Sequence, residues 1–164
     1  MITPANNPDV FVINSSQLGS HFLPREGDSS RTTGPLEGLS TGGAPSRRRV
    51  LVVDDVSDVT EMLSVLLTHA GYEVTTASSA PQAIELARKT QFEMIVSDIG
   101  MPEMNGYELA QVLRTEPGYE SVPMVAVTGY SMFDDRNRSL TAGFDAHVTK
   151  PIDPRAFLSL IEQL

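Results

Sequence analysis

From Val50 onward the sequence alternates short apolar runs with amphipathic segments. Five runs have the length and composition of buried strands: VLVV at 50–53, YEVTTA at 72–77, FEMIVS at 92–97, MVAVT at 124–128 and AHVT at 146–149. Strands that alternate with helices predict a parallel sheet with helices on both faces. Five such units in about 115 residues predict a single α/β domain with three αβα layers.

The segments between these runs have helical spacing and recognisable ends. Apolar side chains recur at intervals of three and four residues after Ser57, and Ser79 is a candidate N-cap. The pattern predicts helices over 57–70, 80–90, 105–116, 132–142 and 154–164. The fourth of these is unusually polar, which predicts weak packing against the sheet.

The first part of the chain has a different composition. Residues 1–48 are rich in glycine, proline and serine, so they bury too little apolar surface to offset their chain entropy. We therefore expect a disordered tail over 1–48 and a folded domain over 49–164. An apolar cluster, Val10 to Ile13, could dock on some other surface, although a passive leader is the preferred interpretation.

Charge excludes several classes of partner. Residues 50–164 carry 17 of the 21 acidic residues and 7 of the 12 basic ones. This excess argues against nucleic acid or an anionic membrane as a direct partner. The sequence has no apolar run long enough to cross a membrane, no secretory signal and no cysteine, so a cytoplasmic location is expected.

Acidic side chains follow two of the expected strands. Asp54 and Asp55 come directly after the first strand, and Asp98 follows the third. Because open α/β sheets collect their ligands at the carboxyl ends of the strands, we expect these carboxylates to lie close together. Mg²⁺ would relieve their repulsion, since it binds through one or two carboxylates and keeps several waters. Taken alone, the acidic pair could equally begin a loop or cap a helix.

Two more polar residues follow the remaining strands. Thr128 ends the fourth strand and Lys150 follows the fifth. A hydroxyl and an ammonium group at this edge are suited to binding phosphoryl oxygens. Each is unremarkable alone, but together with the three carboxylates they predict a site where an aspartate takes up a phosphoryl group.

These motifs resemble the response-regulator receiver family over about 50–164. The resemblance rests on the acidic pair Asp54-Asp55, on the run from Asp98 to Pro102 with Asn105-Gly106, on Thr128 followed by a small residue, and on Lys150-Pro151. It implies a doubly wound, flavodoxin-like sheet of five parallel strands in the order 2-1-3-4-5. It also implies a cis Lys150-Pro151 bond.

The resemblance further implies the roles of the site residues. Asp98 would accept a phosphoryl group from a histidine kinase or a histidine phosphotransfer protein. Asp55, Asp98 and the carbonyl of Gly100 would bind Mg²⁺, and Asp54 would help through water. Lys150 and Thr128 would neutralise the phosphoryl oxygens. Such a domain is a stoichiometric phosphoacceptor that assists its own phosphorylation and dephosphorylation, and is not a conventional enzyme.

The family's aromatic switch position is His147 in this chain. We expect Thr128 to turn toward the phosphoryl group and His147 to move into the space it leaves. Output would pass through the surface formed by residues 130–142, the strand at 146–149 and the last helix. Gly100 and Tyr130 occupy the positions that gate the attacking water.

Two other functions remain open. The chain could be a receiver-like binding module that works without phosphate, although every acceptor residue is present. It could also be a phosphatase with an aspartate nucleophile, but Gly100 replaces the second acid that such enzymes need. No output domain is expected after Leu164, so the downstream target would be a separate protein that the sequence does not identify.

Overall fold

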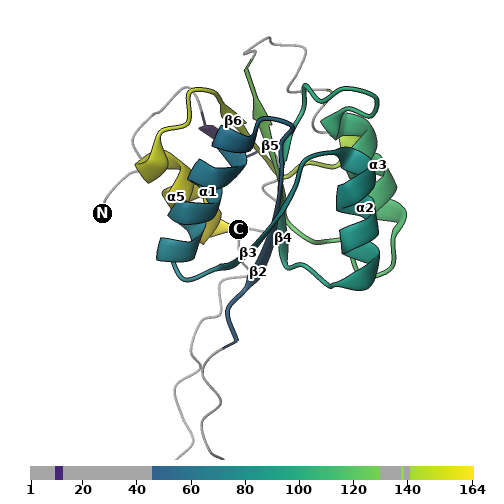
Figure 1. The fold of residues 1–164 in the computed structure, drawn as a ribbon, viewed down its shortest axis with the longest axis horizontal. Helices are drawn as coiled ribbons and strands as arrows, with labels where there is room; N and C mark the ends of the chain where they lie inside the picture. Colours follow the sequence, from purple (N-terminus) through teal and green to yellow (C-terminus); the bar gives the residue numbers. More distant parts are fainter. Residues whose placement is uncertain (1–9, 13–45, 130–137, 139–140) are drawn as a thin grey trace, which may run out of the picture.

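The computed structural model describes residues 10–12, 46–129, 138 and 141–164, with the backbone alone for 10–12. Its centre is a six-stranded sheet in the order β1-β6-β5-β4-β2-β3 (Figure 1). The five parallel strands are β2 (Arg49–Val53), β3 (Glu73–Ala77), β4 (Met94–Asp98), β5 (Met124–Thr128) and β6 (Ala146–Thr149). Their spatial order is the predicted 2-1-3-4-5, which confirms the flavodoxin-like fold.

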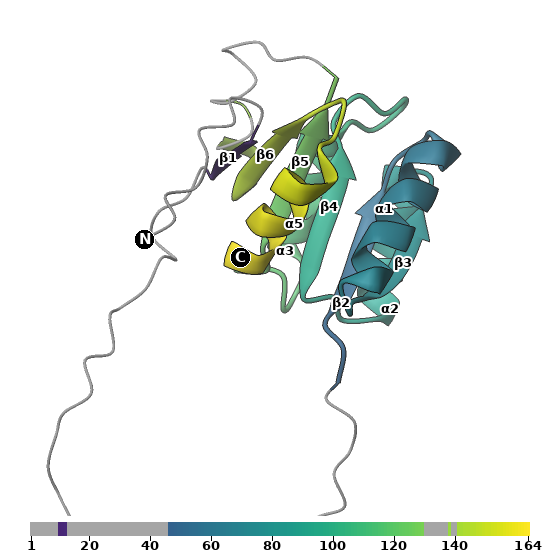
Figure 2. The same cartoon turned by 90° about the vertical axis from the view of Figure 1, so that its left-hand side faces the viewer.

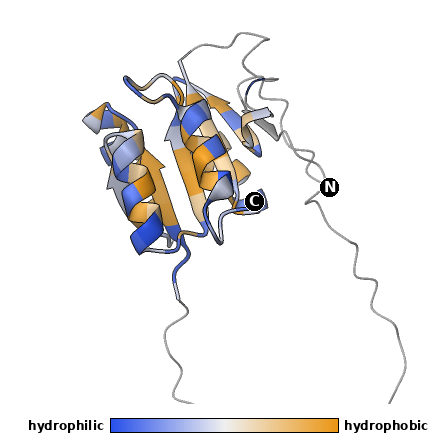
Figure 3. Cartoon of the chain, turned by 90° about the vertical axis from the view of Figure 1, so that its right-hand side faces the viewer, coloured by the Kyte–Doolittle hydropathy of each residue, from blue (hydrophilic) through white to orange (hydrophobic). Residues whose placement is uncertain are grey.

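Helices cover both faces of the sheet. One face carries α1 (Ser57–His69) and α5 (Pro154–Gln163), and the other carries α2 (Ala80–Lys89) and α3 (Gly106–Thr115) (Figure 1). The strands between them are strongly apolar (Figure 3). Alternate residues of β2 divide between two cores, since Leu51 belongs to the core on the α2 and α3 side and Val52 to the other.

Capping residues begin three helices. The side chain of Ser79 accepts a hydrogen bond from Gln82 N at the start of α2, as predicted. At α3, Asn105 and Glu108 form a capping box. Asp153 accepts two backbone hydrogen bonds at the start of α5. These caps fix where the loops at the carboxyl edge of the sheet end.

The N-terminal part differs from the expected disordered tail in one segment. β1 (Val10–Val12) pairs antiparallel with β6 at the edge of the sheet (Figure 2). The prediction of a passive leader is wrong for this segment, and the sheet has one strand more than the five expected. Residues 1–9 and 13–45 of the expected tail lie outside the described residues, as does most of the polar helix expected over 132–142.

No helix among the described residues has the length and apolar character needed to cross a membrane.

Candidate functional site

The carboxyl edge of the sheet brings together the predicted acidic residues. Asp54 and Asp55 follow β2, and Asp98 is the last residue of β4. These two strands are neighbours, with Val53 opposite Ser97. Carboxylate oxygens of Asp54, Asp55 and Asp98 all lie within 4.8 Å of one another. The connectivity of the sheet reverses between β2 and β4, so the cluster lies at its topological switch point.

Lys150 supplies the positive charge of this cluster. It follows β6, and its Nζ donates to Asp54 Oδ2 at 2.9 Å and to Asp98 Oδ1 at 3.2 Å. The Lys150 side chain therefore reaches past the end of β5, and its ammonium group bridges the ends of β2 and β4. Its backbone N also donates to the carbonyl of Thr128 at 2.7 Å, which ties the end of β6 to the end of β5.

Burial sets the electrostatics of the two bridged carboxylates. Asp54 is 2% exposed and Asp98 is 6% exposed, whereas Asp55 is exposed. Burial is the largest influence raising the pKa of Asp98, the charge of Asp54 raises it further, and Lys150 opposes both. Burial lowers the pKa of Lys150, but hydrogen bonding to Asp54 and the charges of Asp98 and Asp54 outweigh this, so its pKa is raised. The ammonium group is thus held charged beside two buried acids.

The carboxylates of the cluster could hold a divalent cation. Three carboxylates and one ammonium leave an excess of negative charge in a partly buried site. Asp55 is exposed, and a Cβ placed on Gly100 would lie 3.8 Å from Asp98 Oδ2, so the Gly100 backbone is close to the second carboxylate oxygen. Hard oxygen donors at this spacing suit Mg²⁺.

Thr128 and His147 lie on β5 and β6, the strands that end beside the cluster. Thr128 is buried at the end of β5, one position beyond Val127, which pairs with Asp98. His147 is buried in the middle of β6, three residues before Lys150, with Ala126 of β5 on one side and Phe11 of β1 on the other. Tyr130, the second predicted gating residue, lies outside the described residues. The Lys150-Pro151 peptide bond is cis, as predicted.

Gly106 supports the end of β4 through a contact that its place in the sequence motif did not reveal. Its N–H donates to the carbonyl of Ile99 at 3.0 Å, so the start of α3 packs directly on the backbone that follows Asp98. A Cβ at Gly106 would overlap the carbonyl oxygen of Asp98 and lie 2.8 Å from the Cα of Ile99. Only glycine permits this approach, which is a tertiary contact that spacing along the sequence cannot show.

Arg114 is a second supporting residue that sequence reasoning missed. Its guanidinium group donates to the carbonyls of Gly143, Tyr119 and Val122 and to the carboxylate of Asp145. Asp145 in turn accepts from the backbone N of Met124 at 2.9 Å. This half-buried network holds residues 143–145, the segment that leads into β6. A single arginine at the end of an amphipathic helix gives no sequence signal for it.

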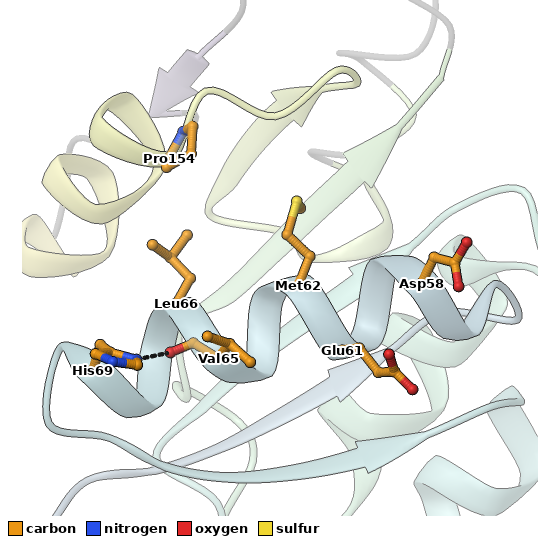
Figure 4. Close-up of a pocket in the computed structure, with 7 residues that line it drawn as sticks. All are labelled: Asp58, Glu61, Met62, Val65, Leu66, His69 and Pro154. Carbon is orange, nitrogen blue, oxygen red and sulfur yellow. Dashed lines mark hydrogen bonds between the residues drawn. The ribbon is translucent and has the colours of Figure 1, made fainter.

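A shallow groove between α1 and α5 opens beside the cluster. Met62 and Leu66 point from α1 toward Pro154 at the start of α5 (Figure 4). Val65 is 60% exposed and Met62 is 41% exposed, which is high for large apolar side chains. α1 begins two residues after Asp55, so the Asp58 end of this groove is the end nearest to the acidic cluster along the chain.

Comparison with known proteins identifies the same architecture. The family model described as "Response regulator receiver domain" matches residues 50–162. An uncharacterized 14.6 kDa protein of Leptolyngbya boryana is 39% identical over 70% of this chain and 87% of its own length. The chemotaxis protein CheY4 of Vibrio cholerae superposes with a TM-score of 0.69 at 32% identity, over 73% of this chain and all of CheY4.

Other relatives are longer proteins. The response regulator PleD of Caulobacter vibrioides is 33% identical over 71% of this chain but only 26% of its own length. The probable transcriptional regulatory protein TcrX of Mycobacterium tuberculosis is 40% identical over 43% of its length. The similarity to these two proteins thus covers less than half of each.

Proposed function

Because this chain belongs to the response-regulator receiver family, we propose that it accepts a phosphoryl group on Asp98 from a histidine kinase or a histidine phosphotransfer protein. The observation that carries the proposal is the bridge from Lys150 to both Asp54 and Asp98. A lysine held beside the end of β4, together with a buried carboxylate whose pKa is raised, is suited to phosphoryl transfer rather than to a surface ion pair.

The chemistry assigns a role to each side chain. An oxygen of Asp98 attacks phosphorus, the bond from phosphorus to the donor imidazole breaks, and its electron pair returns to the ring nitrogen. The product is an acyl phosphate on Asp98. Lys150 and the hydroxyl of Thr128 neutralise the phosphoryl oxygens in a loose transition state, where positioning and electrostatics supply most of the rate.

Asp55, Asp98 and the carbonyl of Gly100 would hold a Mg²⁺ ion, and Asp54 would assist through water. When bound, this ion supplies the positive charge that allows a phosphoryl group to approach three carboxylates. Lys150 alone cannot do so, since its single charge is already shared between Asp54 and Asp98.

Signal output follows from movement along β6. Lys150 leaves its bridge when it contacts a phosphoryl oxygen, and its backbone is bonded to the carbonyl of Thr128. A shift at this point acts on Thr128, on His147 and on the adjoining surface of β6 and α5. The domain therefore carries a signal to a separate protein target, and water later hydrolyses the acyl phosphate.

Labelling with a phosphodonor tests the acceptor. Wild-type protein incubated with radiolabelled acetyl phosphate and Mg²⁺ should form one base-labile, hydroxylamine-sensitive phosphoryl linkage, and Asp98→Asn should form none. EDTA should prevent labelling of the wild type. Equal labelling of the variant would refute Asp98 as the acceptor, and an unlabelled wild type with full metal would favour the phosphate-independent binding module.

The groove on α1 is suited to contact the phosphodonor protein, because it joins an exposed apolar surface to the acceptor edge. Val65→Glu should slow transfer from a phosphorylated histidine-containing partner by about tenfold, the cost of a moderate interface contact. Gln111→Glu is the matched control, since Gln111 is exposed on α3, on the opposite face of the sheet. Labelling by acetyl phosphate should be unchanged in both, and an equal loss with both donors would place the effect of Val65 in the chemistry.

A further inference from the structure

The outer edge of β6 is a place where an extended segment can bind. β6 pairs with β5 along one edge, from Ala146 opposite Val125 to Thr149 opposite Thr128. Its other edge pairs with β1 in the described part of the chain. A strand edge presents unpaired N–H and C=O groups, and an uncovered edge recruits strands from other molecules.

β1 comes from a distant part of the sequence. Its register is Val10 opposite Val148, Phe11 opposite His147 and Val12 opposite Ala146. It also contacts α5, so it covers the corner where β6 and α5 meet (Figure 2). Valine and phenylalanine are strong strand formers, which suits a segment that binds by backbone pairing.

We propose that the outer edge of β6 is a strand-binding site and that residues 10–12 of the same chain fill it as a built-in, displaceable ligand. The importance of this surface for signalling rests on the function proposed above, because β6 and α5 form the expected output surface. Any partner that binds there as an extended strand must first displace β1.

The short pairing makes β1 easy to displace. It spans three residues, whereas strands in globular proteins commonly span five or six. Closing the chain between Val12 and Arg49 costs entropy that grows only slowly with length, so the intrachain strand still has an advantage over a free segment. A connection of roughly 35 residues reaches on the order of 100 Å when extended, far more than the width of this sheet.

The pairing also touches the residues that would sense phosphorylation. Phe11 lies opposite His147 in the ladder, and Lys150 follows one residue after the end of β6. The carbonyl of Thr128 is bonded to Lys150 N at 2.7 Å. A rearrangement of this strand end therefore alters the ladder to which β1 is bound.

Engineered cysteines test the register and the identity of the occupant. The chain has no cysteine, so a pair introduced at Val12 and Ala146 would be the only thiols. Directly opposed residues of an antiparallel pair lie within disulfide distance. Mild oxidation at low micromolar concentration should give a cross-linked monomer for Val12→Cys with Ala146→Cys. The register-shifted pair Val10→Cys with Ala146→Cys should cross-link at least fivefold more slowly.

Two results would overturn the proposal. Cross-linked dimers as the main product would make a second copy of the chain the occupant. Equal cross-linking of both pairs would mean that residues 10–12 have no fixed register on β6. Neither readout involves phosphorylation, so loss of Asp98 labelling would refute the proposed function and leave this proposal unaffected.

A peptide tests whether the edge can bind a strand from another molecule. Phe11→Pro breaks the centre of β1, because proline lacks the N–H and fits poorly in a strand. The peptide PDVFVIN, which is residues 8–14, should shift the NMR amide signals of residues 146–149 in this variant at millimolar concentration. In the wild type and in Phe22→Pro the edge is filled, so the shifts should be at least fivefold smaller. Equal shifts in all three proteins, or none in any, would contradict a masked strand-binding site.

Discussion

Asp98 ends a strand that has neighbours on both sides and helices on both faces, whereas the outer edge of β6 is covered by a strand of three residues. All five residues of β4 are buried. The phosphoryl transfer proposed at Asp98 would need groups held to fractions of an ångström, which a dense core provides. A surface that exchanges partners needs a bound segment whose bound and released states are close in free energy, and a short strand meets this need. Under the proposed function, this difference separates the strand that would react with the phosphodonor from the sheet edge that would respond.

Gly106→Ala would disturb the tightly packed end of β4. Of the changes compared here, it should lower the free energy of unfolding most. An added methyl would overlap the carbonyl oxygen of Asp98 and force α3 away from the end of β4. We expect the free energy of unfolding in urea to fall by about 2 kcal/mol, which is typical of overpacking. Gly129→Ala is the control, because a Cβ there meets nothing within 4 Å. Similar losses in both variants would show that the close approach at Gly106 is unimportant.

Asp98→Asn should stabilise the fold in metal-free buffer. Burial and the charge of Asp54 raise the pKa of Asp98, so the folded state binds its proton more tightly than the unfolded state does. The carboxylate is therefore destabilising at pH values above this raised pKa. At pH 7 the variant should therefore have a higher free energy of unfolding than the wild type.

The difference should disappear as the pH falls through the raised pKa toward about 3.9, the value of an ordinary aspartate. Urea unfolding of both proteins across this range measures it. A variant less stable than the wild type at pH 7 would mean that the bridge from Lys150 outweighs burial at Asp98.

The contrast between the buried strands and the edge strand β1 also explains which features the sequence could predict. Asp54, Asp98 and Lys150 each adjoin an apolar run, so strand periodicity and parallel pairing bring them to one edge without detailed knowledge of packing. The close approach of Gly106 to Ile99 depends on how α3 packs, which periodicity does not contain. The pairing of β1 with β6 was not predicted, because a short apolar segment in a polar region carries too little pattern to indicate a distant partner.

Phe11→Pro tests the β1 side of the comparison with β4. It should have the smallest effect on global stability. Removing β1 exposes one edge of β6, but the paired edge and the core that contains Ala146 and Val148 remain. The free energy of unfolding should fall by less than about 0.5 kcal/mol, since part of the loss is offset by the reduced entropy of the unfolded chain. Phe22→Pro controls for this offset, and urea unfolding monitored by circular dichroism measures all three proteins. A loss as large as that of Gly106→Ala would make β1 part of the structural core, and a segment bound that tightly could not serve as a ligand that partners displace.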